Sequence, residues 1–136
     1  MSLYCEIETQ FKNADALVAA LTEINPKWVG NIEVHENPQY LYGHKGDIRQ
    51  ERAHIIIRRA HVGSHSNDIG FFKQDGRFTA IISEYDAREF DAKWLASLKS
   101  EYAFQTISIQ QKQRGRIITR ERLENGHQRI TVKGFR

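Results

Sequence analysis

The sequence predicts an α+β fold, a mainly antiparallel sheet with two helices packed on one face. Two observations predict it. Short apolar runs typical of strands are joined at turn signals such as Asp75-Gly76, and two longer segments carry apolar residues at helical spacing. In chain order the elements read β-α-β-β-β-β-α-β-β, an order typical of the α+β class.

The N-terminal residues predict a strand followed by a helix. Residues 3–10 alternate loosely in polarity, which is typical of a strand. Asn13 stands where a helix N-cap is expected, and residues 14–24 carry apolar side chains at helical spacing. The pair Asn25-Pro26 then ends the helix, because a residue that precedes proline avoids the α-helical region.

The middle of the chain predicts two strands separated by a polar stretch. Residues 28–36 form the first of them, and Asn37-Pro38 breaks it. Residues 40–50 are polar and contain glycine. Residues 53–58 follow without any alternation of polarity, which indicates a central strand covered on both faces.

A hairpin and a second helix come next. Residues 67–85 form the hairpin, since the Asp75-Gly76 turn accepts the positive φ angles that a tight connection needs. The helix begins at Asp91, carries an apolar stripe, and continues or restarts until Gly115 stops it.

Length and composition limit the class of protein. A chain of 136 residues predicts a single domain, 1–136. Apolar runs such as Ile55-Ile56-Ile57 are far shorter than the ~18 residues that cross a bilayer, and no secretory signal is readable. One cysteine cannot form an intrachain disulfide. We therefore expect a cytoplasmic protein without membrane contact.

Several segments, in the same order along the chain, resemble those of one known family. They are residues 1–10, the helix with Asp15-Ala16-Leu17 and Ala20-Leu21, the loop Tyr42-Gly43-His44-Lys45-Gly46 before strand 53–58, Asn67-Asp68-Ile69-Gly70-Phe71 followed by Gly76 and Phe78, the helix with Trp94, Leu98 and Tyr102, and the hairpin around Asn125-Gly126. The chain is thus similar to the domain of unknown function twelve fifty-seven, which includes the hypothetical chloroplast reading frame thirty-five proteins of plastids and cyanobacteria.

The resemblance implies a function in company with other proteins. The family has no established catalytic residues, and its genes often lie near those of an AAA-class ATPase and a very small partner protein. Relatives also occur in phage genomes. The resemblance therefore implies a small non-enzymatic adaptor that binds the AAA-type ATPase or the small companion protein. A phage-encoded accessory protein is an alternative.

The histidines are the first candidates for metal ligands. His61 and His65, with His54 nearby in sequence, could supply three imidazoles. The pair lies in a glycine-serine loop, however, and no His-Glu-x-x-His or Cys-x-x-Cys pattern supports it. We expect solvated loop histidines, and neither a metal nor another cofactor.

The acidic residues are the first candidates for acid–base chemistry. Glu84, Asp86, Glu89 and Asp91 cluster in sequence, but they flank a helix start, where capping and the helix dipole favour carboxylates. The sequence has no nucleophile elbow, Walker loop or dinucleotide fingerprint. We therefore expect no catalytic residue and no enzymatic activity.

A short loop is a candidate for contact with nucleic acid. Gly43-His44-Lys45-Gly46 encloses basic residues between two glycines, as does the loop with which KH domains clamp a nucleic-acid backbone. The alternative is a turn that leads into the next strand, which explains both glycines.

The C-terminal segment carries the clearest binding signal. Residues 117–135 predict a hairpin, and a two-residue loop at Asn125-Gly126 would pair Arg122 with Arg129 and Arg120 with Thr131. The outward face would then be a basic strip of Arg120, Arg122, Arg129 and Lys133. The inward face would hold Ile117, Thr119, Leu123, Ile130 and Val132.

This predicted strip has three interpretations. It binds an acidic protein surface, it binds nucleic acid, or it is a solvated face whose charge protects an edge from aggregation. Like charges directly opposite one another cost stability, so an anionic partner would relieve them. We favour the acidic protein, because the strip has four basic residues and the whole chain a net charge of only +3.

Overall fold

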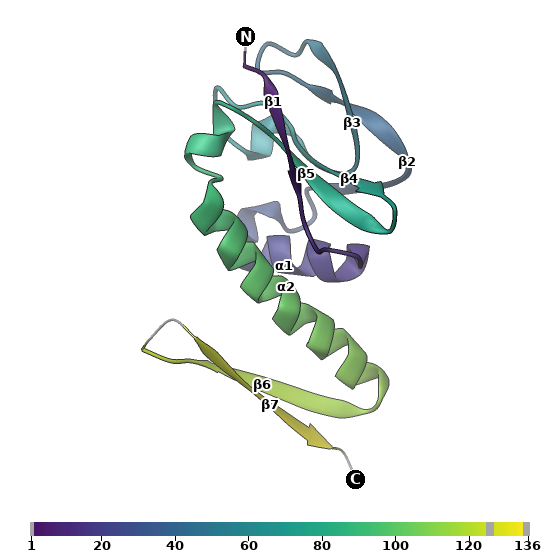
Figure 1. Cartoon of the computed structure of the whole chain (residues 1–136), viewed down its shortest axis with the longest axis vertical. Coiled ribbons are helices and arrows are strands. Elements are labelled where there is room, and N and C mark those ends of the chain that lie inside the picture. Colours follow the sequence, from purple (N-terminus) through teal and green to yellow (C-terminus); the bar gives the residue numbers. More distant parts are fainter. Residues whose placement is uncertain (1, 125–126, 135–136) are drawn as a thin grey trace.

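The computed structural model describes residues 2–124 and 127–134. It confirms the α+β fold, with the two helices packed on one face of a five-stranded sheet (Figure 1). The sheet order is β1-β5-β4-β3-β2, and every neighbouring pair of strands is antiparallel. Two further strands form a separate sheet, β6-β7.

The elements follow the predicted order. They are β1 (Tyr4–Glu8), α1 (Ala14–Ile24), β2 (Ile32–Tyr42), β3 (Ile48–Ile57), β4 (Ile69–Gln74), β5 (Arg77–Ser83), α2 (Ala92–Gln113), β6 (Arg116–Arg122) and β7 (Gln128–Gly134). Short 3-10 turns lie at Pro26–Trp28, Arg59–His61 and Asp86–Arg88. None of the helices in the described part of the chain is long and apolar enough to cross a membrane.

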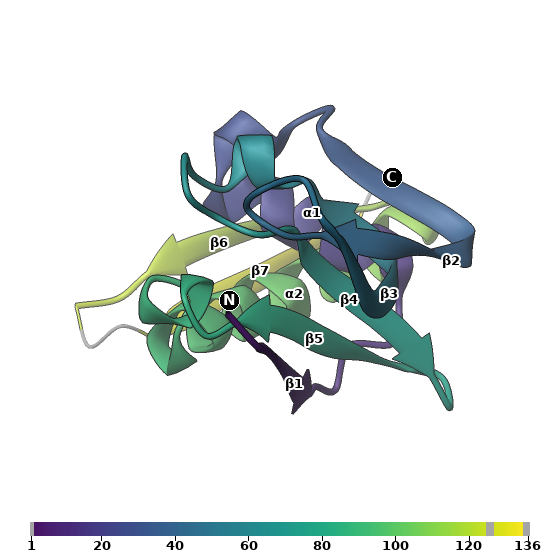
Figure 2. The ribbon, with the colours of Figure 1, turned by 90° about the horizontal axis from the view of Figure 1, so that it is seen from above.

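The elements stack in three layers. Figure 1 shows α1 and α2 between the five-stranded sheet above and the β6–β7 hairpin below, and Figure 2 looks down through these layers from the sheet side. The main core lies between sheet and helices and includes Leu17, Trp28, Ile55, Phe71 and Leu98, all without exposed surface. Helix α2 also buries Glu101 and Ser108, which are seven residues apart and therefore lie on the same side of the helix.

Local signals place the helices and the central hairpin. The Asn13 side chain accepts a hydrogen bond from the Ala16 N–H at 2.9 Å, and Asp91 caps α2 by accepting one from the Trp94 N–H at 3.0 Å. At the β4–β5 turn Asp75 and Gly76 have φ angles of 53° and 78°. Both angles suit the tight turn expected from an Asp-Gly pair.

The path of β2 differs from the prediction. A strand break at Asn37-Pro38 was expected, but β2 runs through these residues to Tyr42 and forms a long hairpin with β3. The pairing register shifts between Val34 and Gln39, so Pro38 lies in an irregular segment of an edge strand. A proline is tolerated there because its missing N–H interrupts no regular ladder.

The part of the β2–β3 hairpin that contains Leu41 and Ala53 covers part of the sheet face opposite the helices. Leu41 and Ala53 form a second apolar cluster with Ile56 and Ile81. A Cβ added at Gly70 would lie 2.5 Å from that of Ala53, so the close approach of β3 requires glycine there.

The C-terminal hairpin forms as predicted, but with a different register. Arg122 pairs with Gln128, Arg120 with Ile130 and Ile118 with Val132, one residue away from the expected pairs. The Leu123 N–H donates to the His127 carbonyl at 2.8 Å, so the connection is one residue longer than the predicted two-residue loop. Asn125-Gly126, on which the prediction rested, lies outside the described residues.

Candidate functional site

The buried carboxylate of Asp68 joins three parts of the sheet. It accepts backbone N–H bonds from Tyr42 and from Arg59, each at 2.7 Å. The Arg58 guanidinium adds an ion pair at 2.8 Å. These partners come from the end of β2 and from the segment after β3, while Asp68 itself precedes β4. The carboxylate is therefore satisfied by the chain, and its role is to hold the two connections together.

A second polar group lies beside it around Asn67. The Asp86 carboxylate accepts hydrogen bonds from the Asn67 N–H and from the Ser83 hydroxyl, both at 2.9 Å. The Asn67 side chain donates to Ser83 at 2.9 Å and accepts from the His44 N–H at 3.0 Å. The segment Asn67-Asp68-Ile69-Gly70-Phe71, one of those that carry the family resemblance, thus begins in a buried hydrogen-bond network.

Arg58 extends this network to the surface of β2. Its guanidinium pairs with Glu33 at 2.8 Å, and the His35 ring lies 2.7 Å from the same carboxylate. The Arg58 hydrogen bond lowers the pKa of Glu33, and Glu33 in turn raises the pKa of Arg58. Both groups therefore stay charged, and Arg58 lies over the Tyr42 ring at 5.3 Å.

The loop Gly43, His44, Lys45 and Gly46 is the turn between β2 and β3. The Gly46 N–H donates to the Gly43 carbonyl at 2.9 Å, and Gly46 has a φ of +79°, which favours glycine. The His44 carbonyl accepts from the Arg59 guanidinium at 3.0 Å. Strands, not helices, flank the loop, so its geometry differs from the KH-type clamp. The Lys45 side chain is exposed, and that of His44 is partly buried.

The three histidines considered as ligands do not converge. His54 packs on the Phe72 ring with centroids 4.9 Å apart, and its Nδ1 accepts the Lys73 N–H at 2.9 Å. His61 and His65 are exposed in the segment that follows β3. Within the described residues, no group of three or more His, Cys, Asp or Glu side chains is placed to hold a metal ion.

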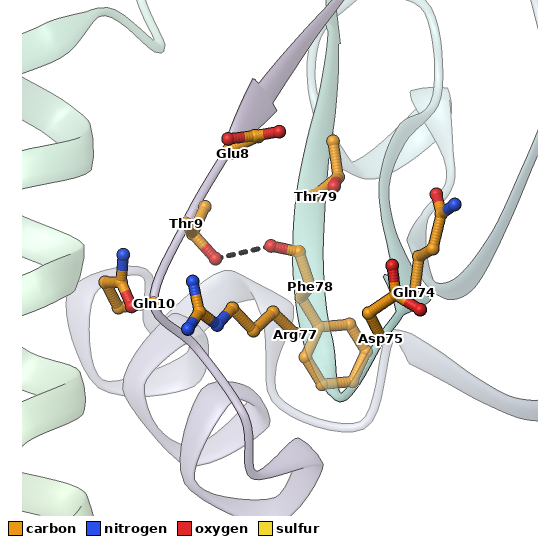
Figure 3. Close-up of a pocket in the computed structure, with 8 residues that line it drawn as sticks. All are labelled: Glu8, Thr9, Gln10, Gln74, Asp75, Arg77, Phe78 and Thr79. Carbon is orange, nitrogen blue, oxygen red and sulfur yellow. Dashed lines mark hydrogen bonds between the residues drawn. The ribbon is translucent and has the colours of Figure 1, made fainter.

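A polar cleft lies where β1 ends beside the β4–β5 turn (Figure 3). It has a volume of about 390 Å³ and is lined by Glu8, Thr9, Gln10, Gln74, Asp75, Arg77, Phe78 and Thr79. The Thr9 hydroxyl donates to the Phe78 carbonyl at 2.5 Å, so this hydroxyl is already engaged. The lining contains neither His nor Cys, and its ionisable side chains are those of Glu8, Asp75 and Arg77.

The predicted basic strip is divided between the two faces of the hairpin. Because the register differs by one residue, Arg120 and Arg122 lie on one face, and Arg129 and Lys133 on the other. The inward face carries Ile118, Ile130 and Val132, so Ile130 and Val132 lie on the predicted face, whereas Ile117 and Thr119 lie on the other. The prediction of one continuous outward strip is therefore wrong.

Three of these four basic residues also have carboxylates beside them. Arg120 lies 2.5 Å from the buried Glu101 and 3.3 Å from Glu23. Arg122 lies 3.6 Å from Glu101, and Arg129 lies 3.6 Å from Glu121 on the outer face. Arg120 thus fastens β6 to the helices, which the sequence did not indicate because Glu101 is distant along the chain.

Exposed aromatic side chains gather on the β2–β3 hairpin. Tyr40 is 51% exposed, and Ile48, which pairs with Tyr42, is 66% exposed. The Arg52 guanidinium lies 5.8 Å from the Tyr40 ring centroid. We refer to Tyr40, Tyr42 and Ile48 as the hairpin patch. The predicted polar stretch 40–50 hides this patch, although Tyr40 and Tyr42 have the two-residue spacing of a strand face.

Comparison with known proteins supports the resemblance drawn from the sequence. Residues 30–131 match a family model described as protein of unknown function DUF1257. The chain is also 28% identical over 109 residues to the uncharacterized protein ycf35 of Cyanophora paradoxa, covering 79% of this chain and 76% of that protein. No solved structure matches the chain.

The matched region runs from the segment before β2 into β7. It includes the hairpin patch, the Asp68 network and the Glu101–Arg120 ion pair. Because the family model covers well over half of the sequence, the chain belongs to the DUF1257 family.

Proposed function

We propose that the protein is a non-enzymatic adaptor that binds a protein partner through the hairpin patch, acting with an AAA-type ATPase system. The observation that carries this proposal is the exposure of Tyr40, Tyr42 and Ile48 on one hairpin. A large exposed apolar side chain standing alone is ordinary, whereas neighbouring aromatic residues are typical of binding surfaces.

The surroundings of the patch favour a preformed surface. Arg52 and Arg58 lie over the Tyr40 and Tyr42 rings, and the Arg58 guanidinium is itself fixed by Glu33 and Asp68. Side chains held in place before binding lose less conformational entropy when a partner docks. Tyrosine and arginine are also among the residues that contribute most to binding energy in protein interfaces.

The choice of an ATPase as partner rests on the family resemblance, which places such a gene near members of this family. The small companion protein is the other expected partner. A direct test uses a purified AAA-type ATPase whose gene lies near that of a family member and measures its binding to this protein by calorimetry. The double variant Tyr40→Ser/Tyr42→Ser should weaken binding by at least about tenfold, or about 1.4 kcal/mol.

A matched control separates the patch from a general loss of apolar surface. Val29 and Tyr85 are also exposed, and Tyr85 also lies beneath an arginine, Arg88. The double variant Val29→Ser/Tyr85→Ser should bind as the unmodified protein does. Equal affinity of all three proteins for the ATPase would contradict the assignment of the patch, and absence of binding by the unmodified protein would contradict the choice of partner.

A further inference from the structure

Charge is unevenly divided along the chain. Residues 1–111 contain 12 basic and 15 acidic side chains, whereas residues 112–136 contain 8 basic and 2 acidic ones, so a net charge of −3 is followed by one of +6. The small net charge of the whole protein therefore conceals a strong asymmetry. Such an asymmetry produces a local field that attracts anions to one part of the surface.

Part of this charge collects at one end of the molecule. Lys112 lies in the last turn of α2, Arg114 is its C-cap, and Arg116 begins β6. Lys133 pairs with Ile117, the residue after Arg116, so these two basic side chains lie at the same end of the hairpin but on opposite faces. All four basic side chains are exposed. Figure 1 shows that this end of α2, β6 and β7 lies far from the five-stranded sheet. We refer to Lys112, Arg114, Arg116 and Lys133 as the basic end.

The basic end differs from the rest of the hairpin in lacking carboxylate partners. No acidic residue occurs between Glu101 and Glu121. Among the described residues, the side chains of the basic end form no ion pair within 4.0 Å, whereas Arg120, Arg122 and Arg129 each lie near a glutamate. The polar contact of Arg116 is a neutral one, to the Gln111 side chain at 3.1 Å.

Helix capping explains only half of this cluster. Basic residues at a helix C-terminus are favoured by the helix dipole, which accounts for Lys112 and Arg114. It does not account for Arg116 and Lys133, which lie on strands. Both add positive charge to the same end of the hairpin, and an anionic partner would offset that charge.

We propose that the basic end binds the phosphate backbone of duplex nucleic acid without reading its sequence. Phosphate is favoured over a protein surface because protein interfaces are enriched in aromatic residues, and none of the described residues 110–119 and 131–134 is aromatic. Arginine makes paired hydrogen bonds to phosphate oxygens, and the side chains of Gln110 and Gln113 add neutral donors nearby. This site is separate from the hairpin patch and does not depend on the proposed adaptor function.

The test measures binding of a labelled DNA duplex of mixed sequence between about 50 and about 200 mM salt. The logarithm of the affinity should fall linearly with the logarithm of the salt concentration, with a slope of up to about 3.6 for four phosphate contacts. The triple variant Arg114→Gln/Arg116→Gln/Lys133→Gln should weaken binding by more than about tenfold at the lower salt concentration and reduce the slope by about 2.7.

The matched control is Lys27→Gln/Lys93→Gln/Lys99→Gln, which removes the same net charge from exposed positions elsewhere. It should keep most of the affinity and the whole slope. Equal loss in both variants would overturn the proposal, because binding would then follow net charge and not the basic end. Absence of saturable duplex binding by the unmodified protein at the lower salt concentration would also overturn it, as would a stronger affinity of the basic end for a polyglutamate peptide than for the duplex.

Discussion

Asp68 has no exposed surface, yet its carboxylate is bonded to two backbone N–H groups and to one guanidinium. A buried carboxylate with fewer partners would be a candidate for catalysis, because burial without compensation favours the protonated acid. Here the contacts of Asp68 link the segment before β4 to the end of β2 and to the segment after β3. The same reasoning assigns a structural role to Asp86, whose partners are Asn67 and Ser83.

His54 is the residue that should make stability depend on pH. Burial and, less strongly, the nearby Lys73 charge lower the pKa of its imidazole below 6.5. Its Nδ1 must be unprotonated to accept the Lys73 N–H. As pH falls below about 6.5, the unfolded chain takes up this proton before the folded one does, so the contribution of His54 to the free energy of unfolding decreases until the lowered pKa is passed.

Replacing His54 with phenylalanine tests this dependence. His54→Phe keeps a ring against Phe72 but cannot titrate, so the loss of unfolding free energy between about pH 7.5 and about pH 5.5 should be smaller than in the unmodified protein. Urea denaturation at the two pH values provides the measurement. His65→Gln, an exposed loop substitution, should leave the loss unchanged. An equal loss in all three proteins would show that His54 does not contribute.

At the scale of elements, local signals predicted most of the fold. Asn13 and Asp91 cap the two helices, and the Asp75-Gly76 turn sets the β4–β5 hairpin. Each signal acts within a few residues and is therefore readable in a sequence. The path of β2 was not predictable in this way, because whether Pro38 ends a strand depends on its position at the edge of a sheet that distant residues complete.

The candidate site was less predictable than the fold for the same reason. A change of one residue in pairing register moves every side chain of a strand to the opposite face. The predicted two-residue turn placed the pairs of the β6–β7 hairpin one residue away from those observed. The partner of Arg120 could not be read from the hairpin at all, because Glu101 belongs to α2. The hairpin patch remained hidden because the strand that displays Tyr40 and Tyr42 continues past a proline.

The Glu101–Arg120 ion pair should dominate the attachment of the C-terminal hairpin to α2. The Glu101 side chain is 1% exposed and that of Arg120 is 20% exposed, so either residue left alone would be a poorly solvated charge. Glu101→Leu or Arg120→Leu alone should lower the free energy of unfolding by up to about 3–5 kcal/mol. The double variant should lose much less than the two single losses together, since the charges that then lose a partner, Glu23 and Arg122, are 55% and 62% exposed.

Urea denaturation of the four proteins closes this double-mutant cycle, and hydrogen exchange locates the effect. Amides of β6 and of the neighbouring part of α2 should exchange faster in each single variant, whereas those of β4 and β5 should be little changed. Arg116→Leu is the control, because Arg116 is exposed on the same strand and has no ion pair among the described residues. Additive losses in the cycle would show that the pair does not couple the hairpin to the helix.

The whole molecule carries its aromatic and its basic surfaces in different places. The hairpin patch belongs to β2 and β3 of the five-stranded sheet, whereas the basic end lies beyond the helices, near the opposite end of the long axis (Figure 1). The main core between them contains buried residues of the sheet and of both helices. Two surfaces separated in this way allow two partners to bind at once without direct competition between them.

This separation predicts independent effects on the two binding reactions. Substitutions at well-separated sites without shared partners usually have additive effects, within about 0.5 kcal/mol. Tyr40→Ser/Tyr42→Ser should therefore leave the affinity for duplex DNA and its salt dependence unchanged. Arg114→Gln/Arg116→Gln/Lys133→Gln should likewise leave the affinity for the ATPase unchanged, and a protein with all five substitutions should lose both to the extent of the separate variants. A loss of ATPase binding in the variant of the basic end would show instead that the two surfaces serve one extended interface.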